Sequence, residues 1–207
     1  MTKASAFWDR LAERYSRQPI ADEDTYRRKL EITQSYLRPD MRVLEFGCGT
    51  GGTAIIHAPF VRQIRAFDFS TAMIEIARLK AAKAGVANVD FDVASIETLE
   101  AAPAEFDVVL GLSVLHLLKD KDAAVAKVCR LLKPGGVFIS STTCLGDTMA
   151  WMKLIAPAGA ALGVLPTLDI MSSRQLKACL VGAGLVIEQV LDPGKGKAVF
   201  VVARRPS

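Results

Sequence analysis

Residues 42–52 read R-V-L-E-F-G-C-G-T-G-G, and the rest of the chain is interpreted from this stretch. Its first half is a short apolar run of the kind that forms a strand. Glycines then follow at alternate positions, which neither a strand nor a helix interior favours, because glycine loses the most backbone freedom there. The pattern predicts a tight strand-to-helix turn where a ligand can approach the backbone. A helix beginning at Gly52 or Thr53 would direct free backbone N–H groups at that ligand.

A second strand is expected over residues 61–67, followed directly by Asp68. Asp68 lies about 20 positions beyond the glycine turn, where nucleotide-binding βαβ units place an acid that accepts hydrogen bonds from ribose hydroxyls. Ser70 is a good N-cap for the helix expected over residues 71–84, which leaves Asp68 free for a ribose. The glycines do not form the G-x-G-x-x-G pattern of dinucleotide enzymes, so a dehydrogenase is disfavoured.

Four motifs occur in order along the chain: E-F-G-C-G-T-G, F-D-F-S, F-D-V-V-L and L-K-P-G-G. Together they resemble the class I S-adenosylmethionine-dependent methyltransferases, over roughly residues 5–204. The resemblance implies an α/β fold: a Rossmann-like three-layer sandwich with a seven-stranded, mostly parallel sheet. The strand order would be 3-2-1-4-5-7-6, with an antiparallel last strand. The resemblance also implies S-adenosylmethionine as the cofactor and methyl transfer as the reaction.

Residues 133–136, K-P-G-G, are expected to end a helix, and residues 172–175 are expected to form a capping box that opens another. The expected alternation of helices and strands is typical of one α/β domain, and 207 residues are enough for a sizeable core. We therefore expect a single methyltransferase domain with four parts. They are an N-terminal helical cover (1–39), a cofactor-binding core (40–142), an apolar lid or interface insertion (143–171), and a C-terminal helix with a hairpin (172–207).

The predicted cofactor site lies at the carboxyl ends of the strands, beside the glycine turn, because ligands of such sheets bind where the strand order reverses. Glu45 stands in an apolar setting that requires donors. We expect it to cap N–H groups of the turn and to orient the cofactor's ammonium group. Ser95 stands where family members often carry an acid that contacts adenine, and a neutral hydroxyl would accept more weakly. The predicted cofactor-binding residues are Tyr15, Glu45, Gly47, Gly49, Asp68, Phe69, Met73, Ser95, Ile96 and Gly111.

Several of these side chains have an equally simple structural interpretation. In the resembled family, the segment that carries Tyr15 folds over the cofactor, but the tyrosine can also simply pack. Phe69 and Met73 either surround the nucleoside or fill the core. Tyr15 and His116 are the candidate catalytic residues, although a histidine among leucines is more often structural, as we expect for His57.

Residues 111–118, around His116, lack the N/D-P-P-Y motif that enzymes acting on amino groups of nucleic-acid bases or glutamine often show. Those substrates are therefore disfavoured.

Residues 154–168 carry no charged side chain and are interrupted by Pro157 and Pro166. They are too few for a membrane span, which needs about 20 residues. The stretch is therefore a lid that selects the acceptor, a homodimer interface or cover, or an element that embeds in a membrane surface.

Composition narrows the function further. The net charge of +4, from 26 basic and 22 acidic residues, comes without a long basic run, so a nucleic-acid partner is not expected. Four cysteines without a C-x-x-C pair, and an N-terminus without an apolar secretory core, predict a reduced, cytoplasmic protein. Two histidines offer no histidine-rich metal site. We expect methyl transfer to a small, partly apolar acceptor. The alternatives are a lipid or quinone methyltransferase at a membrane surface and a non-catalytic S-adenosylmethionine-binding regulator.

Overall fold

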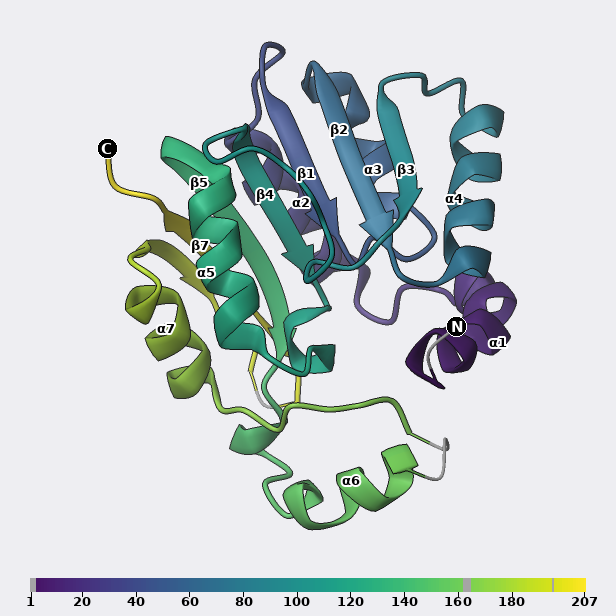
Figure 1. The fold of residues 1–207 in the computed structure, drawn as a ribbon, viewed down its shortest axis with the longest axis vertical. Helices are drawn as coiled ribbons and strands as arrows, with labels where there is room; N and C mark the ends of the chain where they lie inside the picture. The colour runs from purple at the N-terminus through teal and green to yellow at the C-terminus, as the bar shows by residue number, and fades with distance from the viewer. Residues whose placement is uncertain (1–2, 162–164, 195) are drawn as a thin grey trace. The chain divides into compact units, whose positions relative to one another are not determined.

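The computed structural model describes residues 3–161, 165–194 and 196–207 (Figure 1). The chain forms two compact units, Met1–Glu100 and Ala101–Ser207. The single-domain organisation of the four parts stays a prediction.

The first unit contains three parallel strands and most of the predicted cofactor site. β1 pairs with β2 and β2 with β3, so their carboxyl ends lie at one edge, where Phe46 is level with Phe67 and Asp68 with Val93. Helix α4 packs on β2 and β3, while α2 and α3 lie behind the strands in the view of Figure 1. The elements are α1 (Lys3–Arg17), α2 (Glu23–Ser35), β1 (Arg42–Phe46), α3 (Gly52–His57), the 3-10 turn η1 (Ala58–Phe60), β2 (Gln63–Asp68), α4 (Thr71–Lys83) and β3 (Val89–Val93).

The second unit contains four strands, of which β4 and β5 are parallel. β7 runs antiparallel to β5 on one side and to β6 on the other, and β6 and β7 form the predicted C-terminal hairpin. The elements are β4 (Phe106–Leu112), η2 (Leu115–Leu117), α5 (Lys121–Leu131), β5 (Leu132–Thr143), η3 (Leu145–Asp147), α6 (Met152–Ala161), α7 (Ser173–Gly182), β6 (Val186–Leu191) and β7 (Ala198–Arg204).

The strand order of the seven-stranded sheet is β3-β2-β1-β4-β5-β7-β6. This order confirms the predicted fold class, including the antiparallel last strand. Local signals were also read correctly: Ser70 caps α4 by accepting from the N–H of Met73, and Ser172 with Gln175 forms a capping box at the start of α7.

Two segments differ from the expectation. Residues 133–136 were expected to end a helix, but α5 ends earlier and this segment already belongs to β5. The reason is non-local pairing: the N–H of Gly135 donates to Arg205 O (2.9 Å), and the N–H of Arg205 donates to Gly136 O (2.8 Å). The second difference is α6, which continues past Pro157. Residues 162–164 of the apolar stretch lie outside the described residues.

Large apolar side chains fill the interior of each unit. In the first unit, the rings of Phe46 and Phe67 stack with centroids 6.5 Å apart. In the second, residues 108–110 of β4 and 199–203 of β7 are almost continuously buried, as in strands covered on both faces. The four cysteines are free thiols. No helix in the described part of the chain is long and apolar enough to cross a membrane.

Candidate functional site

The glycine turn after β1 has the geometry that its sequence predicts. Gly47, Gly49 and Gly51 have φ of 65°, 53° and 74°, in the left-handed region that favours glycine. A Cβ on Gly51 would also lie 2.8 Å from the side chains of Ala77 and Phe91, so the turn packs closely against α4 and β3. A Cβ on Gly52 would meet nothing within 4 Å, so Gly52 at the start of α3 faces open space.

Asp68 holds the glycine turn to the start of α4. Its Oδ2 accepts from the N–H of Gly49 (3.0 Å) and its Oδ1 from the N–H of Ser70 (2.9 Å). The expectation that Asp68 is free was therefore wrong, because both oxygens already bind backbone N–H groups. Each oxygen still has a lone pair for a further donor. Burial raises the pKa of Asp68, and the bonds from Ser70 and Gly49 oppose that shift.

Glu45 is a buried carboxyl group at the end of β1, with 2% of its surface exposed. Its Oε2 is buried and has no hydrogen-bond partner among the residues that the structure describes. The expected cap of the glycine turn is therefore not made by this oxygen. Burial raises the pKa of Glu45 to about 8, because an ionised carboxylate without donors is costly there.

Tyr15 lies against the glycine turn. A Cβ on Gly49 would be 3.7 Å from Cε1 of Tyr15. The tyrosine ring makes an edge contact with Trp8, with centroids 6.4 Å apart, and its side of α1 stays partly open, since 47% of Tyr15 is exposed. Burial of its hydroxyl, followed by the nearby charge of Asp68, raises the pKa of Tyr15.

Two polar residues near the turn were missed in the sequence. Asp9 of α1 accepts from the hydroxyl of Ser70 (2.6 Å) and from the N–H of Ala72 (3.1 Å). Lys80 of α4 donates to the hydroxyl of Thr50 in the turn (2.9 Å). The partners are 61, 63 and 30 positions away, so no local spacing could reveal them.

The end of β3 carries the residues predicted to contact adenine. The hydroxyl of Ser95 accepts from the N–H of Thr98 (3.3 Å). Ile96 and Met73 are 2% and 3% exposed, which favours core packing of both side chains. Phe69, by contrast, is partly exposed.

The second unit holds the remaining two predicted residues. Gly111 is buried near the end of β4, and Ser113 after it has a left-handed φ of 59°, which is strained for serine. His116 lies in η2, and its Nδ1 is buried without a hydrogen-bond partner among the described residues. Burial lowers the pKa of His116 to about 4, so the imidazole is neutral at pH 7. Its backbone O accepts from the N–H of Asp169 (2.8 Å).

Comparison with known families decides the class of protein. Residues 37–184 match the model of a methyltransferase domain. The chain belongs to this methyltransferase family. The predicted resemblance is thereby confirmed, and the methyltransferase uses S-adenosylmethionine as its methyl donor.

The curated relatives include enzymes of quinone chemistry. The "Ubiquinone biosynthesis O-methyltransferase" of Xanthomonas axonopodis pv. citri is 34% identical over 170 residues, which cover 78% of this methyltransferase and 70% of that enzyme. The enzyme of the same name from Xanthomonas euvesicatoria pv. vesicatoria is 35% identical over 156 residues, covering 72% and 64%. In the relative from Paracidovorax citrulli the match covers 52% of the enzyme, so this chain spans between 52% and 70% of these relatives.

A solved structure shares the fold of the methyltransferase. The YcgJ protein of Bacillus subtilis superposes with a TM-score of 0.72 at 17% identity, covering 87% of this chain and 99% of that one. At this identity the likeness shows the fold alone, and it identifies no acceptor.

Proposed function

We propose that this methyltransferase transfers a methyl group from S-adenosylmethionine, held at the carboxyl ends of β1, β2 and β3, to a small acceptor with an apolar body. One observation supports the donor-binding part of this proposal. Glu45 lies at the end of β1, which leads into the left-handed glycine turn, and its buried Oε2 lacks a partner among the described residues. A buried acceptor without a donor calls for an explanation. The ammonium group of the methyl donor supplies one.

The neighbouring residues fit the other parts of the donor. Asp68 has its geometry fixed by two backbone N–H groups and keeps lone pairs for the ribose hydroxyls. Gly49 leaves space beside the ring of Tyr15, which would cover the bound donor. Ser95 at the end of β3 would accept from the adenine amino group. The donor supplies an electrophilic methyl group, and the residues align it and exclude water.

The acceptor half rests on a pocket inside the second unit. It has a volume of about 270 Å³. Cavities of about 150 Å³ bind benzene, so this pocket suits one ring with short substituents. Its apolar wall comes from α6 and the segment before α7, and its lining residues are Lys121, Lys153, Ala156, Pro157, Leu168, Asp169, Ile170, Met171 and Gln175.

Charge in this pocket favours an acceptor with an acidic group. Lys121 is already paired with Asp122 (3.1 Å) and Asp169 (3.2 Å). Lys153 has no ion-pair partner within the described ranges, so its charge is available to a ligand. An apolar ring with a carboxylate would satisfy both the wall and Lys153. The relatives named as ubiquinone biosynthesis O-methyltransferases support an oxygen atom, such as that of a ring hydroxyl, as the methylated group.

His116 is the candidate base for such a hydroxyl. Its imidazole is neutral, its Nδ1 is unpartnered in the described chain, and its backbone is tied to Asp169 of the pocket wall. A neutral imidazole can take the proton that the hydroxyl loses as the methyl group arrives. Replacing a general base typically lowers the rate by about 10²- to 10⁴-fold. We expect such a loss of kcat in His116→Asn, with the donor Kd unchanged.

The test is an acceptor panel read out as S-adenosylhomocysteine formation. It pairs single-ring phenols with and without a carboxylate, and larger fused-ring phenols. The variant Ala156→Phe fills the pocket from its buried wall, and Ala158→Phe, on the exposed face of α6, is the matched control. We expect turnover of carboxylated single-ring phenols, lost in the first variant and kept in the second. Turnover of the fused-ring compounds by Ala156→Phe would contradict this acceptor class.

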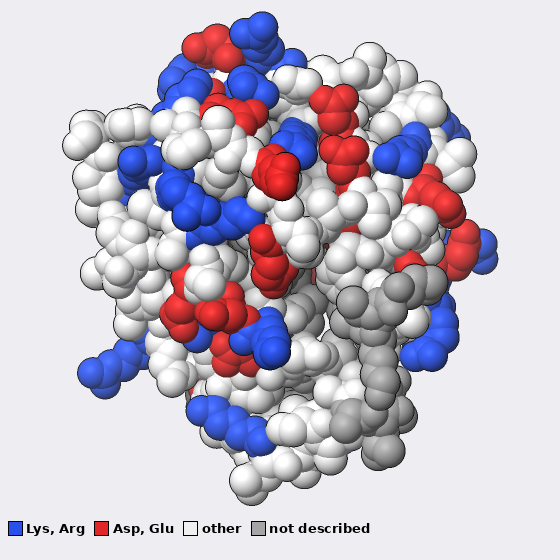
Figure 2. All heavy atoms as spheres, in the orientation of Figure 1, with Lys and Arg blue, Asp and Glu red and all other residues white. Residues whose placement is uncertain are grey.

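A second candidate function, methylation at a membrane surface, is favoured by one exposed apolar cluster. Trp151, directly before α6, and Leu154 and Ile155, in its first turn, are 57%, 85% and 48% exposed. Figure 2 shows a largely uncharged surface over α6, at the bottom of the view. Tryptophan beside aliphatic residues is typical of segments that rest at a membrane interface.

Co-sedimentation with phosphatidylcholine vesicles, with and without phosphatidylglycerol, tests this candidate. We expect binding by the wild type that is lost in Leu154→Glu. If the cluster is instead the predicted homodimer interface, the same substitution converts a dimer to a monomer in sedimentation equilibrium without any vesicle binding.

A further inference from the structure

Helix α1 is tied to the donor site by a carboxylate that belongs to no motif. Asp9 sends one oxygen, Oδ1, to the first turn of α4, where it accepts from the hydroxyl of Ser70 (2.6 Å) and the N–H of Ala72 (3.1 Å). An O–H···O⁻ bond of this length is charge-assisted and stronger than a neutral one. The positive end of α4 adds to the attraction for a carboxylate.

The bonds of Asp9 continue into the glycine turn. Ser70 is fully buried, and its N–H donates to Asp68 Oδ1 (2.9 Å). The other oxygen of Asp68 accepts from the N–H of Gly49 (3.0 Å). A path of hydrogen bonds therefore leads from α1 through Ser70 and Asp68 to the backbone of the turn. A movement of α1 at Asp9 would therefore shift Ser70 and, through it, Asp68, which is proposed to hold the ribose.

The same helix reaches the turn a second time through Tyr15. Six positions separate Asp9 from Tyr15, which is about 9 Å along a helix at 1.5 Å per residue. Tyr15 is 47% exposed, so apolar burial holds this end only loosely. An isolated helix of the length of α1 is marginally stable in water, and its docking depends on contacts such as those of Asp9.

We propose that Asp9 is a positioning residue that latches α1 over the donor site, and that this latch sets how tightly S-adenosylmethionine and S-adenosylhomocysteine are held and how fast they leave. The inference rests on the proposed donor site. Asp9 touches neither the reacting atoms nor the donor; it acts through Ser70, Asp68 and the placement of Tyr15.

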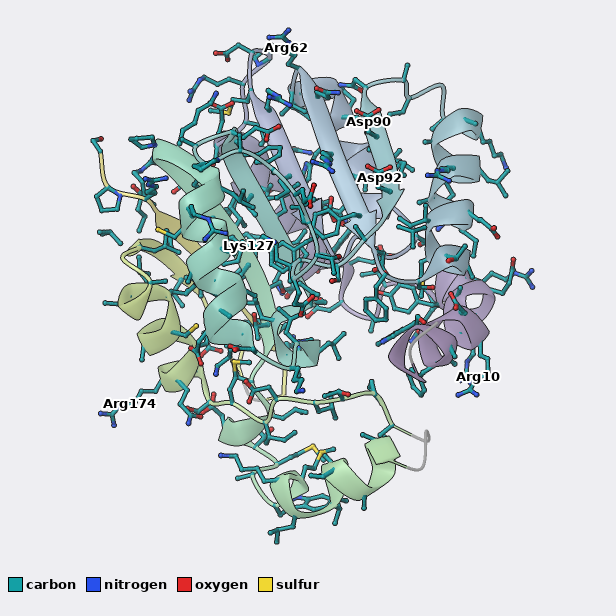
Figure 3. The ribbon with its side chains drawn as sticks, viewed as in Figure 1. Arg10, Arg62, Asp90, Asp92, Lys127 and Arg174 are labelled. Carbon is teal, nitrogen blue, oxygen red and sulfur yellow. The ribbon has the colours of Figure 1, made fainter. Side chains whose placement is uncertain are left out.

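Substitutions at Asp9 separate the latch from its charge. Asp9→Ala removes the acceptor oxygen, whereas Asp9→Asn keeps a carbonyl oxygen that can accept both bonds but removes the charge. Arg10→Ala is the matched control, because Arg10 is the next residue of α1 and extends away from the protein in Figure 3. None of the three changes a residue proposed to contact the donor.

Two measurements are made on the full chain. The first is acrylamide quenching of Trp8 fluorescence without ligand, in a Trp151→Phe background that leaves Trp8 as the one tryptophan of the sequence. The second is the Kd and dissociation rate of S-adenosylmethionine and S-adenosylhomocysteine, with kcat at saturating donor. We expect Asp9→Ala to increase quenching and to weaken both ligands about tenfold, mostly through faster dissociation, with kcat within twofold of the wild type or higher.

The remaining variants decide between a latch and a general loss of stability. In Asp9→Asn, the Kd values of both ligands should stay within about threefold of those of the wild type. Arg10→Ala should bind both ligands as the wild type does. Equal weakening by Asp9→Asn and Asp9→Ala, or unchanged Kd values in Asp9→Ala despite greater quenching, would overturn the inference. If Asp9→Ala does not fold, the same comparison is made between Asp9→Asn and Asp9→Leu. A wild type that binds no S-adenosylmethionine would instead refute the proposed donor site, while unchanged quenching in Asp9→Ala would refute the latch by itself.

Discussion

The protonation state of Glu45 should make the free energy of unfolding depend on pH. Its pKa is about 8 in the folded protein, against 4.5 in a model peptide. Between these values the folded state binds more protons than the unfolded state, so the free energy of unfolding falls as pH rises. The contribution is fully present below pH 4.5 and is lost as pH rises through 8. At about 1.4 kcal/mol per unit, the 2.5 units between pH 4.5 and 7 correspond to roughly 3 kcal/mol.

The perturbation is Glu45→Gln, which keeps the size of the side chain and cannot ionise. We expect the free energy of unfolding of the variant, minus that of the wild type, to rise by about 2 to 3 kcal/mol from pH 5 to pH 7 and further by pH 8.5. Urea denaturation at each pH, without ligand, measures this difference. His57 and His116 occur in both proteins, so their titration cancels. Glu75→Gln, on the exposed side of α4, is the control.

A difference that stays within about 0.5 kcal/mol across this pH range would refute the reasoning, because the carboxyl would then have a partner that the structure lacks. The variant also reports on function. If Glu45 meets the donor's ammonium group, saturating S-adenosylmethionine should stabilise Glu45→Gln less than it stabilises the wild type at pH 8.5.

Three further outcomes are expected. His57 is fully buried and its pKa is lowered to about 4, so its protonation should cost the folded state up to about 3 kcal/mol as pH drops from 6.5 to 4; in urea titrations, the free energy of unfolding of His57→Leu minus that of the wild type should rise by this amount, because His116 and Glu45 titrate in both proteins. Asp68→Ala should weaken S-adenosylmethionine by about 1–3 kcal/mol in calorimetry, while NAD binds neither protein, and should also lower Tm because two N–H groups lose their acceptor. Gly51→Ala should lower Tm strongly, since its Cβ would lie 2.8 Å from Ala77 at a left-handed φ, whereas Gly52→Ala should change it little.

Local patterns in the sequence were enough to place the glycine turn and the starts of two helices. The alternating glycines, the cap at Ser70 and the capping box at Ser172 depend on residues within a few positions, so they can be read directly from the chain. Their φ angles and hydrogen bonds agree with those readings. The strand order followed from the family resemblance rather than from these signals.

Long-range contacts could not be read in the same way. The partner of Asp9 is 61 positions away, and the sequence offered no spacing for this bond. The spacing of Asp68 from the glycine turn predicted a ribose contact, but it did not predict the bond from the N–H of Gly49, 19 positions away. The same limit explains why residues 133–136 were expected to end a helix, although they pair with the end of β7. The roles of Glu45 and His116 toward ligands stay predictions.

The double hydrogen bonding of Asp68 has a consequence for redesign. The carboxylate of Asp68 braces the turn after β1 and, by our proposal, also binds the ribose hydroxyls. A substitution of Asp68 that is meant to accept an altered ribose would therefore lower the stability of the fold as well as the affinity for the donor. Ser95 sits on the neighbouring strand end and bonds to nearby Thr98, outside that brace. Retuning the enzyme toward unnatural nucleoside donors should therefore begin at Ser95 and leave the brace intact.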